Sequence, residues 1–342
     1  MHSYFHKVCL IQVTADDHHF VIDPLGFDLE DLEPLLNVIG DETKTVLMHG
    51  ADYDLRVLDR DFNAEIRGLQ DTQIMARLLG EPRTGLAILI EREIGVQLDK
   101  RHQRADWGRR PLTSGQLAYA AADTAYLGVL ADRLRSRLEE MGRWAWAKEE
   151  FRRLEEVRHV PSETNPLAFE RIKGARSLRG GARNRLFTLF GWRDRQAQKL
   201  DVPPFKILGN RQIIDLAENP PSDLNGLQKV EGVGPRAVRR WGKKLLAHLQ
   251  DPGSAPERLR GPREPAPDPA IRRRLKRLVA VRDPLAEALG IEPGLLCPRN
   301  YAEAVAARQP RCGSLEDLVG AGLDGWRLEV LGDEFLKALA ED

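Results

Sequence analysis

The chain has 342 residues, a formal net charge of +0 and 30% charged residues. This length is too great for one ordinary hydrophobic core and predicts two or three compact units of roughly 100 to 150 residues. No stretch approaches the roughly 18 apolar residues of a membrane span, and residues 1–7 lack the apolar run of a secretory signal. We therefore expect a cytoplasmic protein that does not associate with a membrane.

The zero net charge conceals an uneven distribution along the chain. Residues 1–150 hold 18 Lys and Arg against 26 Asp and Glu, whereas the remainder holds 34 against 26. An acidic first part and a basic second part suit a carboxylate-lined metal site followed by a module that binds polyanions. Solvated helix faces rich in Arg and Glu would produce the same counts.

The cysteines are Cys9, Cys297 and Cys312. Their odd number and wide spacing fit neither a disulfide framework nor a zinc or redox motif. We therefore expect inert thiols in a reducing compartment.

Residues 1–150 are expected to form a mixed α/β domain. Strands are predicted at 8–13, 20–22 and 45–49. The first two strands indicate a hairpin, because only a short polar turn separates them. Helices are predicted at 71–79, at 85–94 and from Thr113 or Ser114 along an apolar stripe to Leu138. Asp71 is a natural N-cap, and the last, long helix is expected to close the domain.

Two carboxylates, Asp52 and Asp54, follow the strand at 45–49. They stand at the edge of the sheet where open α/β folds place their ligand sites, and Asp54 is well placed to bind a metal ion. Either residue would also serve simply to cap or decorate the helix that runs to Leu58. The pattern therefore needs a partner elsewhere in the chain.

The partner is the segment 119–123, Tyr-Ala-Ala-Ala-Asp. A spacing of four residues puts the Tyr119 phenol and the Asp123 carboxylate on one face of a helix, and the small alanines let another surface approach closely. Standing alone, this pattern is common on exposed helix faces. Together with Asp54 it indicates a site built from two separate elements.

Five blocks of the first domain carry the most specific signal. They are His-Gly-Ala-Asp-Tyr-Asp-Leu at 49–55, Asp-Thr-Gln at 71–73, Leu-Asp-Lys at 98–100, Asp-Trp-Gly-Arg-Arg-Pro-Leu at 106–112 and Gln-Leu-Ala-Tyr-Ala-Ala-Ala-Asp at 116–123. In order and spacing these blocks resemble ribonuclease D, one of the four-carboxylate 3′-to-5′ exonucleases with a tyrosine in the third motif. The resemblance implies an α/β ribonuclease H-like exonuclease fold, a mixed sheet with flanking helices.

The resemblance also implies the chemistry of the site. Asp54 corresponds to the second catalytic motif, and Tyr119 and Asp123 correspond to the third. The reaction implied is hydrolysis of the 3′-terminal phosphodiester with two Mg²⁺ or Mn²⁺ ions roughly 4 Å apart. Asp54 and Asp123 would be metal ligands, because hard divalent cations prefer oxygen, and Tyr119 would orient the attacking water.

Basic residues within the matching blocks are candidate contacts for the phosphates of the substrate. The positions are Lys100, Arg101, Arg104, Arg109 and Arg110. Basic residues on a loop are equally often only solvated. Trp107 is interpreted as a packing anchor rather than a base-stacking residue, and Asp71 and Asp99 are interpreted as caps.

The chain departs from the family at its start. The first motif of the family, Asp-x-Glu on the opening strand, contributes two of the four metal-binding carboxylates and would lie a few residues before Met1. Asp16 and Asp17 are poor replacements, because they are in the predicted hairpin turn. The missing strand would lie between the strands at 8–13 and 45–49, so the sheet is expected to be split there. We expect Met1 to be an internal methionine of a longer natural product.

Residues 162–250 are expected to form an all-α unit. They hold 17 Lys and Arg against 8 Asp and Glu, a surplus able to attract phosphates through counterion release. The unit resembles the helicase-and-RNase-D C-terminal (HRDC) domain, chiefly through Asp-Val-Pro-Pro-Phe-Lys-Ile-Leu-Gly-Asn at 201–210. Gly232, Gly234 and Arg236 open a further helix and are candidate phosphate contacts, although glycines there would equally suit a tight turn between helices.

Composition changes again at 251–270, where prolines and glycines replace large apolar residues and predict an extended linker. Helical periodicity returns at 271–342. This last segment resembles the second HRDC domain of ribonuclease D, mainly through Leu-Gly-Ile at 289–291 and Gly-Trp-Arg at 325–327. The predicted organisation is therefore an N-terminally incomplete exonuclease domain, an HRDC domain, a linker and a second HRDC-like domain.

The sequence predicts a metal-dependent 3′-to-5′ exoribonuclease that trims tRNA precursors or other structured RNA, its helical domains holding the body of the RNA. A catalytically inactive nucleic-acid-binding protein is the alternative from another class, because the first motif is absent. A DNA exonuclease or repair factor that binds single-stranded DNA is a further alternative, because phosphate contacts say little about the sugar. A monomer without a protein partner is expected.

Overall fold

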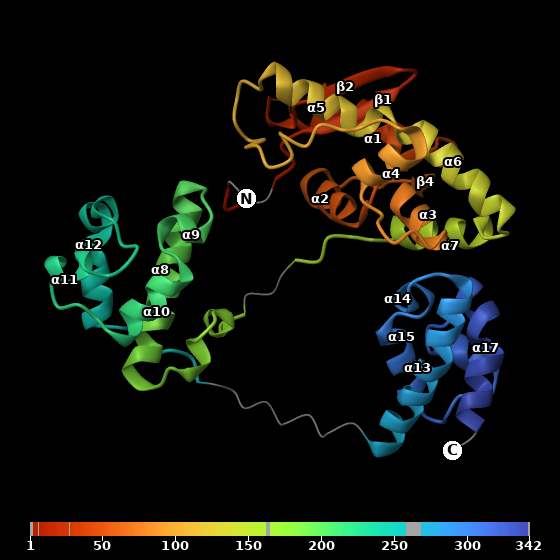
Figure 1. The fold of residues 1–342 in the computed structure, drawn as a ribbon. Helices are drawn as coiled ribbons and strands as arrows, with labels where there is room; N and C mark the ends of the chain where they lie inside the picture. Colours follow the sequence, from red (N-terminus) through yellow and green to blue (C-terminus); the bar gives the residue numbers. More distant parts are fainter. Residues whose placement is uncertain (1–2, 6, 27, 162–164, 258–267, 341–342) are drawn as a thin grey trace. The chain divides into compact units, whose positions relative to one another are not determined.

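The computed structural model describes residues 3–5, 7–26, 28–161, 165–257 and 268–340 (Figure 1). It divides into two compact units. Unit 1 comprises Met1–Lys7, Gly108–Arg110 and Pro161–Gly261, and unit 2 comprises Val8–Trp107, Pro111–Val160 and Pro262–Asp342. Among the residues described, no helix has the length and apolar character needed to cross a membrane. The centre of the predicted linker at 251–270 lies outside the described residues.

The strands of unit 2 form two separate pairs. They are β1 (Ile11–Ala15), β2 (His18–Ile22), β3 (Val46–Met48) and β4 (Leu69–Asp71). β1 and β2 form the predicted antiparallel hairpin, with Asp16 and Asp17 at positive φ of 46° and 61° in its two-residue turn. β3 and β4 pair in parallel. Within the described ranges no ladder joins the two pairs, so the predicted split of the sheet is confirmed.

Helices pack around these strands. The regular ones are α1 (Glu33–Ile39), α2 (Asp52–Phe62), α3 (Thr72–Leu78), α4 (Leu86–Ile94), α5 (Ser114–Ala125), α6 (Leu127–Glu140) and α7 (Trp144–Glu155). The predicted caps are found, since Asp71 accepts from the backbone N–H groups of Gln73 and Ile74, and Thr113 accepts from Gln116.

The prediction of one long helix after Thr113 is wrong, because α5 and α6 are separated at Tyr126 (φ −107°, ψ 1°). α5 packs along the hairpin of β1 and β2, as Figure 1 shows, whereas α6 packs against α3 and α4. Neither Gly nor Pro marks this change of direction in the sequence. The break therefore follows from two different packing partners rather than from a local signal.

The C-terminal helices belong to unit 2. They are α13 (Pro269–Leu289), α14 (Pro293–Leu296), α15 (Arg299–Ala307), α16 (Leu315–Gly320) and α17 (Gly325–Ala340). Their buried side chains, including Leu278 and Trp326, form one continuous hydrophobic cluster with Leu89, Leu130 and Leu134 of the exonuclease domain. We call α13–α17 the C-terminal helical domain.

Unit 1 is helical and has a core of its own. Its regular helices are α8 (Gly180–Leu200), α9 (Pro204–Ile207), α10 (Asn210–Glu218), α11 (Leu224–Gln228) and α12 (Pro235–Gln250). The core contains Phe169, Leu186, Leu216 and Leu245. Tyr4 packs against this core, and its hydroxyl donates to Asp194 Oδ1 at 2.8 Å.

The cysteines are not joined in a disulfide. Cys297 and Cys312 are buried in the C-terminal helical domain. Burial raises the pKa of the Cys297 thiol to about 11, so this thiol is protonated and unreactive at neutral pH.

Candidate active site

A cavity of about 540 Å³ opens in unit 2 between the two strand pairs. One wall is formed by Leu10, Ile11 and Gln12 at β1, and the facing wall by Leu47 and Met48 of β3. Each of these strands has a described ladder partner on one side only. The cavity is thus lined by one strand of each pair, and it contains the predicted catalytic residues.

Asp54 reaches the cavity because α2 begins directly after β3. Ala51 is the N-cap of α2, and Asp52 turns to the surface, where it pairs with Arg56 one turn later at 3.0 Å. The Asp54 side chain is open to solvent within the cavity, although protein atoms surround it on most sides. This burial, together with the negative charge of Asp71, raises the pKa of the Asp54 carboxyl.

Tyr119 and Asp123 line the same cavity from α5. Their spacing of four residues puts the phenol near the carboxylate on one face of α5. Burial raises the pKa of Asp123 to about 6, and the favourable interaction with the nearby Tyr119 hydroxyl partly offsets this rise. Burial and the neighbouring charge of Asp123 also raise the pKa of Tyr119. Trp107 packs beside the Tyr119 ring at 5.8 Å between ring centroids, which supports its interpretation as a packing anchor.

Asp71 supports the site from behind and is only 1% exposed. Besides capping α3, its Oδ2 accepts from the backbone N–H of Ala51 at 2.7 Å. Sequence reasoning found the cap but missed this second bond, because Ala51 precedes Asp71 by 20 residues.

His49 is a wall residue to which the sequence analysis assigned no role. It follows β3, its Nδ1 lies 2.9 Å from Thr72 Oγ1, and burial lowers its pKa, so the imidazole is neutral at neutral pH. Its position directly after a short apolar strand, three residues before the helix of Asp54, could have pointed to this residue.

The predicted basic contacts do not all line this cavity. Lys100 lines the cavity, as does Asp99, whose pKa the adjacent Arg101 side chain lowers to about 2. Arg104 is exposed but is not among the residues that line the cavity, and Arg110 belongs to unit 1. Among the predicted basic contacts in unit 2, Lys100 is the one that lines the cavity with Asp54, Tyr119 and Asp123.

A two-metal site requires several oxygen ligands that converge in one place. Asp54 and Asp123 offer carboxylate oxygens suited to Mg²⁺ or Mn²⁺, but no group of three or more His, Cys, Asp or Glu gathers for a metal ion within the described residues. Asp16 and Asp17 stay in the hairpin turn and are not among the residues lining the cavity. The described side chains therefore do not fit a complete two-metal site by themselves.

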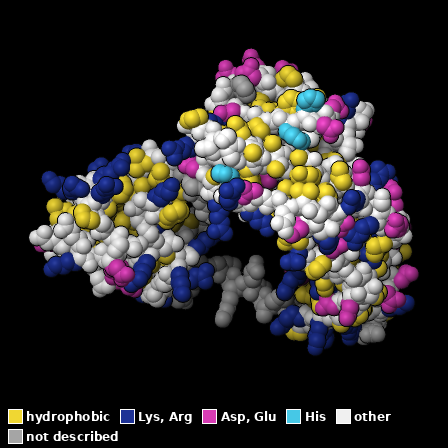
Figure 2. Space-filling model, turned by 45° about the horizontal axis from the view of Figure 1, so that its top comes forward, with side chains coloured by type: hydrophobic (Ala, Val, Ile, Leu, Met, Phe, Trp, Pro, Cys, Tyr) yellow, Lys and Arg dark blue, Asp and Glu magenta, His cyan; other side chains and the backbone are white. Residues whose placement is uncertain are grey.

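A second cavity, of about 480 Å³, lies in unit 1 and contains all three predicted phosphate contacts, Gly232, Gly234 and Arg236. Lys206 and Arg240 also line it, and its lining residues include no Asp or Glu. Figure 2 shows Lys and Arg side chains around apolar ones on the visible face of this unit.

Two of the glycines that line this cavity, Gly232 and Gly234, differ. The positive φ of Gly232, +83°, requires glycine for the turn, and a Cβ there would also force the Gln212 side chain to move, since it would lie 2.1 Å from Nε2. Gly234 has an ordinary φ of −73°, and a Cβ there would meet nothing within 4 Å. Close approach by a ligand would explain glycine at position 234.

Comparison with known proteins identifies the family. Residues 1–139 match a family model described as 3′-5′ exonuclease, and residues 183–249 match one described as HRDC domain. Ribonuclease D of Acidiphilium cryptum is 31% identical over 349 residues, covering 98% of this chain and 84% of that protein. Ribonuclease D of Xanthomonas oryzae is 32% identical over 340 residues, covering 98% and 90%.

A solved structure agrees with these matches. The crystal structure of Escherichia coli RNase D, described as an exoribonuclease involved in structured RNA processing, has a TM-score of 0.62 and 28% identity, covering 100% of this chain and 90% of that chain. The predicted fold, a ribonuclease H-like exonuclease domain followed by an HRDC domain, is confirmed. The chain belongs to the ribonuclease D family of 3′-to-5′ exoribonucleases.

Proposed function

We propose that this exoribonuclease removes 3′-terminal nucleotides from tRNA precursors or other structured RNA, with Asp54, Tyr119 and Asp123 as its catalytic residues. The observation that carries the proposal is that these three side chains line one cavity although they come from two elements far apart in sequence. A cytoplasmic location and a monomeric state remain predictions from the sequence.

Exonucleases of this family depend on metal ions. We infer that two Mg²⁺ or Mn²⁺ ions would be bound, which would supply an activated water and charge stabilisation for the leaving oxygen. Asp54 and Asp123 would supply two of the carboxylate ligands. A strand with two further carboxylates, lying between β1 and β3, would complete the set. The Tyr119 hydroxyl would hold the attacking water beside Asp123, and Lys100 would bind the phosphate of the departing nucleotide.

The HRDC domain would hold the body of the RNA. The cavity lined by Gly232, Gly234 and Arg236 combines positive charge with the absence of carboxylates from its lining, which favours phosphate contacts without sequence preference. Arg104 and Arg110 are proposed as further RNA contacts outside the active-site cavity.

The proposal is tested by hydrolysis of RNA labelled at its 3′ end, with and without Mg²⁺. The chain as printed is compared with a chain extended at its N-terminus by a strand carrying Asp-x-Glu. We expect Mg²⁺-dependent release of single nucleotides from the extended chain, lost in Asp54→Ala and Asp123→Ala. Asp52→Ala is the matched control, because Asp52 lies two residues away but pairs with Arg56 at the surface.

The other functions correspond to different results of the same assay. RNA binding without hydrolysis by either chain would identify a nucleic-acid-binding protein. Preferential degradation of a matched DNA strand would identify a DNA exonuclease. Activity that survives both alanine substitutions would refute the catalytic assignment.

A further inference from the structure

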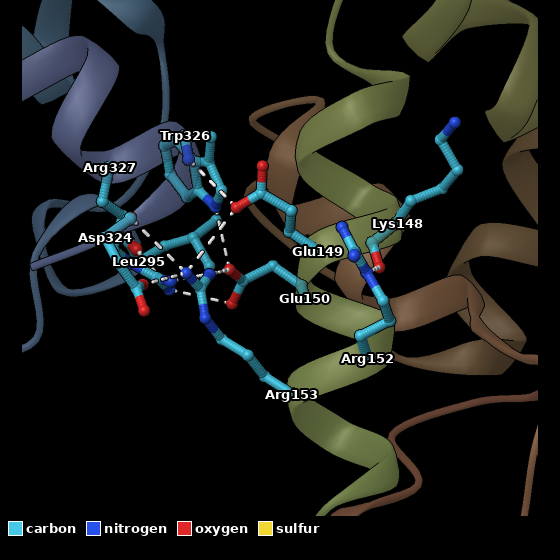
Figure 3. Close-up of polar contacts among 9 residues, drawn as sticks. All are labelled: Lys148, Glu149, Glu150, Arg152, Arg153, Leu295, Asp324, Trp326 and Arg327. Atoms are coloured by element: carbon cyan, nitrogen blue, oxygen red, sulfur yellow. Dashed lines mark hydrogen bonds and ion pairs between the residues drawn. The ribbon is translucent and has the colours of Figure 1, made fainter. Parts of the chain in front are cut away.

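A polar cluster joins the C-terminal helical domain to α7 of the exonuclease domain (Figure 3). Arg327 of α17 donates through both Nη atoms to the Glu150 carboxylate, at 2.6 and 2.8 Å. The Trp326 indole donates to Glu150 Oε1 at 2.8 Å, and the Trp326 backbone N–H donates to Glu149 Oε2 at 3.0 Å. Arg153 pairs with Glu150 from the next turn of α7. The cluster thus fixes one face of α7 to the first turn of α17.

The cluster is buried and electrostatically matched. Trp326 is fully buried and stacks on Trp146 of α7, with ring centroids 4.7 Å apart, and Arg327 is 5% exposed. Burial alone would raise the pKa of the Glu150 carboxyl, but the hydrogen bonds and positive charge of Arg327 outweigh it and lower the pKa. Removal of one partner would leave the charge of the other buried without compensation.

The other end of α7 is attached to the sheet beside the active site. Glu155 Oε1 accepts from the Leu69 backbone N–H at 2.9 Å, at the first residue of β4. β4 ends at Asp71, whose Oδ2 accepts from the Ala51 N–H at 2.7 Å. Ala51 is fully buried and is the N-cap of the helix that carries Asp54. Contacts therefore run without interruption from α17 through α7 and β4 to the start of α2.

We propose that the C-terminal helical domain positions the catalytic carboxylate Asp54, and that Glu150 is a positioning residue acting through α7, Glu155 and Asp71. This inference rests on the proposed role of Asp54. It gives the domain a role in positioning an active-site residue rather than in binding RNA.

The charge of the domain supports this assignment. Residues 268–340 hold 11 Lys and Arg against 11 Asp and Glu, whereas residues 162–250 hold 17 against 8. A segment without net positive charge has little electrostatic attraction for a polyanion. One of its few buried cations, Arg327, is already used by Glu150.

The test uses the full chain, and Glu150→Gln is the main variant. For the kinetic measurements the chain is extended at its N-terminus by the Asp-x-Glu strand. Arg327→Lys is a milder second variant, because it retains the positive charge but loses the bidentate hydrogen bonding to Glu150. Glu139→Gln is the matched control, since Glu139 also binds an arginine, Arg135, at 2.8 Å, but in an exposed pair within one helix. Hydrogen exchange of the Ala51 and Leu69 amides is measured alongside kcat and KM on a short single-stranded RNA.

We expect the Ala51 and Leu69 amides to exchange faster in Glu150→Gln and Arg327→Lys than in the parent chain. We also expect kcat to fall by about tenfold or more at unchanged KM, because small displacements of catalytic groups have large kinetic effects. The double variant Glu150→Arg with Arg327→Glu should recover part of both losses. Glu139→Gln should change neither readout.

Three results would overturn the inference. Variants that unfold at lower temperature but retain parental exchange at Ala51 and parental kcat would show a purely structural contact. A raised KM with unchanged kcat would make the domain an RNA-binding arm. If the extended chain hydrolyses no RNA and the variants leave the exchange unchanged, the positioning role is refuted independently of the proposed function. If such a chain shows faster exchange in the variants, only the proposed function is refuted.

Discussion

The two helical domains are built to one plan but are used differently. α8 and α13 each have 21 residues, α9 and α14 have 4, α10 and α15 have 9, and α12 and α17 have 16. Arg193 and Arg282 occupy the same turn of the first long helix, and each donates to a carbonyl 15 residues later, of Leu208 at 3.0 Å and of Cys297 at 3.3 Å. Similar helix lengths and internal bonds have produced similar folds.

The difference lies in what each domain packs against. The HRDC domain closes its own core and has a cavity lined by cations. The C-terminal helical domain shares a core with the exonuclease domain, and its Trp326 and Arg327 are buried against α7. In these two domains, the side chains at the domain surface decide whether a copy keeps a separate core with a cation-lined cavity or packs against its neighbour.

The largest expected effect is on unfolding stability and distinguishes the two hydrophobic cores. Trp326→Ala removes a fully buried side chain of the shared core and should destabilise unit 2 by about 3 to 5 kcal/mol. Trp192→Ala, in the core of unit 1, should lower only the unfolding transition of that unit. Calorimetry of the two variants checks this expectation. A common shift of all transitions would mean that the units unfold together and the comparison fails.

The next effect concerns Glu150 and pH. Glu150→Gln should cost about 3 kcal/mol of unfolding free energy at neutral pH, because it leaves Arg327 buried without its counter-charge. The folded pKa of Glu150 lies below its usual 4.5. Its contribution is therefore fully present above about pH 4.5 and is lost as pH falls through the folded value. Urea unfolding from pH 7 to pH 3 should show this loss in the parent chain and not in Glu150→Gln.

A smaller effect concerns RNA binding by the HRDC domain. Gly234→Asp introduces a good N-cap for α12 and should leave the domain equally or slightly more stable. It also places a negative charge in the cation-lined cavity and should weaken RNA binding by about tenfold, or 1.4 kcal/mol. Fluorescence anisotropy with labelled RNA measures the affinity. Ser254→Asp is the control, because it makes an equal charge change at an exposed position of unit 1 and should have little effect on RNA affinity. Equal losses of affinity in both variants would show that the loss follows from net charge alone.

The smallest effect compares single arginines on the two domains. Arg236→Ala should weaken RNA binding by about threefold to fivefold at low salt and reduce its salt dependence. Arg299→Ala, on the C-terminal helical domain, should change the affinity by less than about twofold, because Arg299 pairs with Glu303 at 2.7 Å and its domain has no charge surplus. Equal effects of the two substitutions would assign RNA contact to both domains.

Local spacing was sufficient for much of the site. Tyr119 and Asp123 could be paired from sequence because four residues are one helical turn, and Asp71 and Thr113 could be predicted as caps because a cap bonds only to the next few residues. The strand that precedes Asp54 was visible as a short apolar run. The resemblance to a family strengthened the grouping of Asp54 with Asp123, since 69 positions separate them and spacing alone could not bring them together.

Neighbouring residues in the chain were enough to predict many of the helices and strands, the caps at Asp71 and Thr113, the helical face of Tyr119 and Asp123, and the basic charge of the HRDC domain. Tertiary packing was needed to show that α5 and α6 separate at Tyr126, that Asp71 also accepts from the Ala51 N–H, and that the C-terminal helical domain belongs to the same unit as the exonuclease domain. These features depend on which apolar faces meet, and similar amphipathic helices can be buried against many partners. Similar helices therefore became a separate basic domain in one half of the chain and a support for the active site in the other.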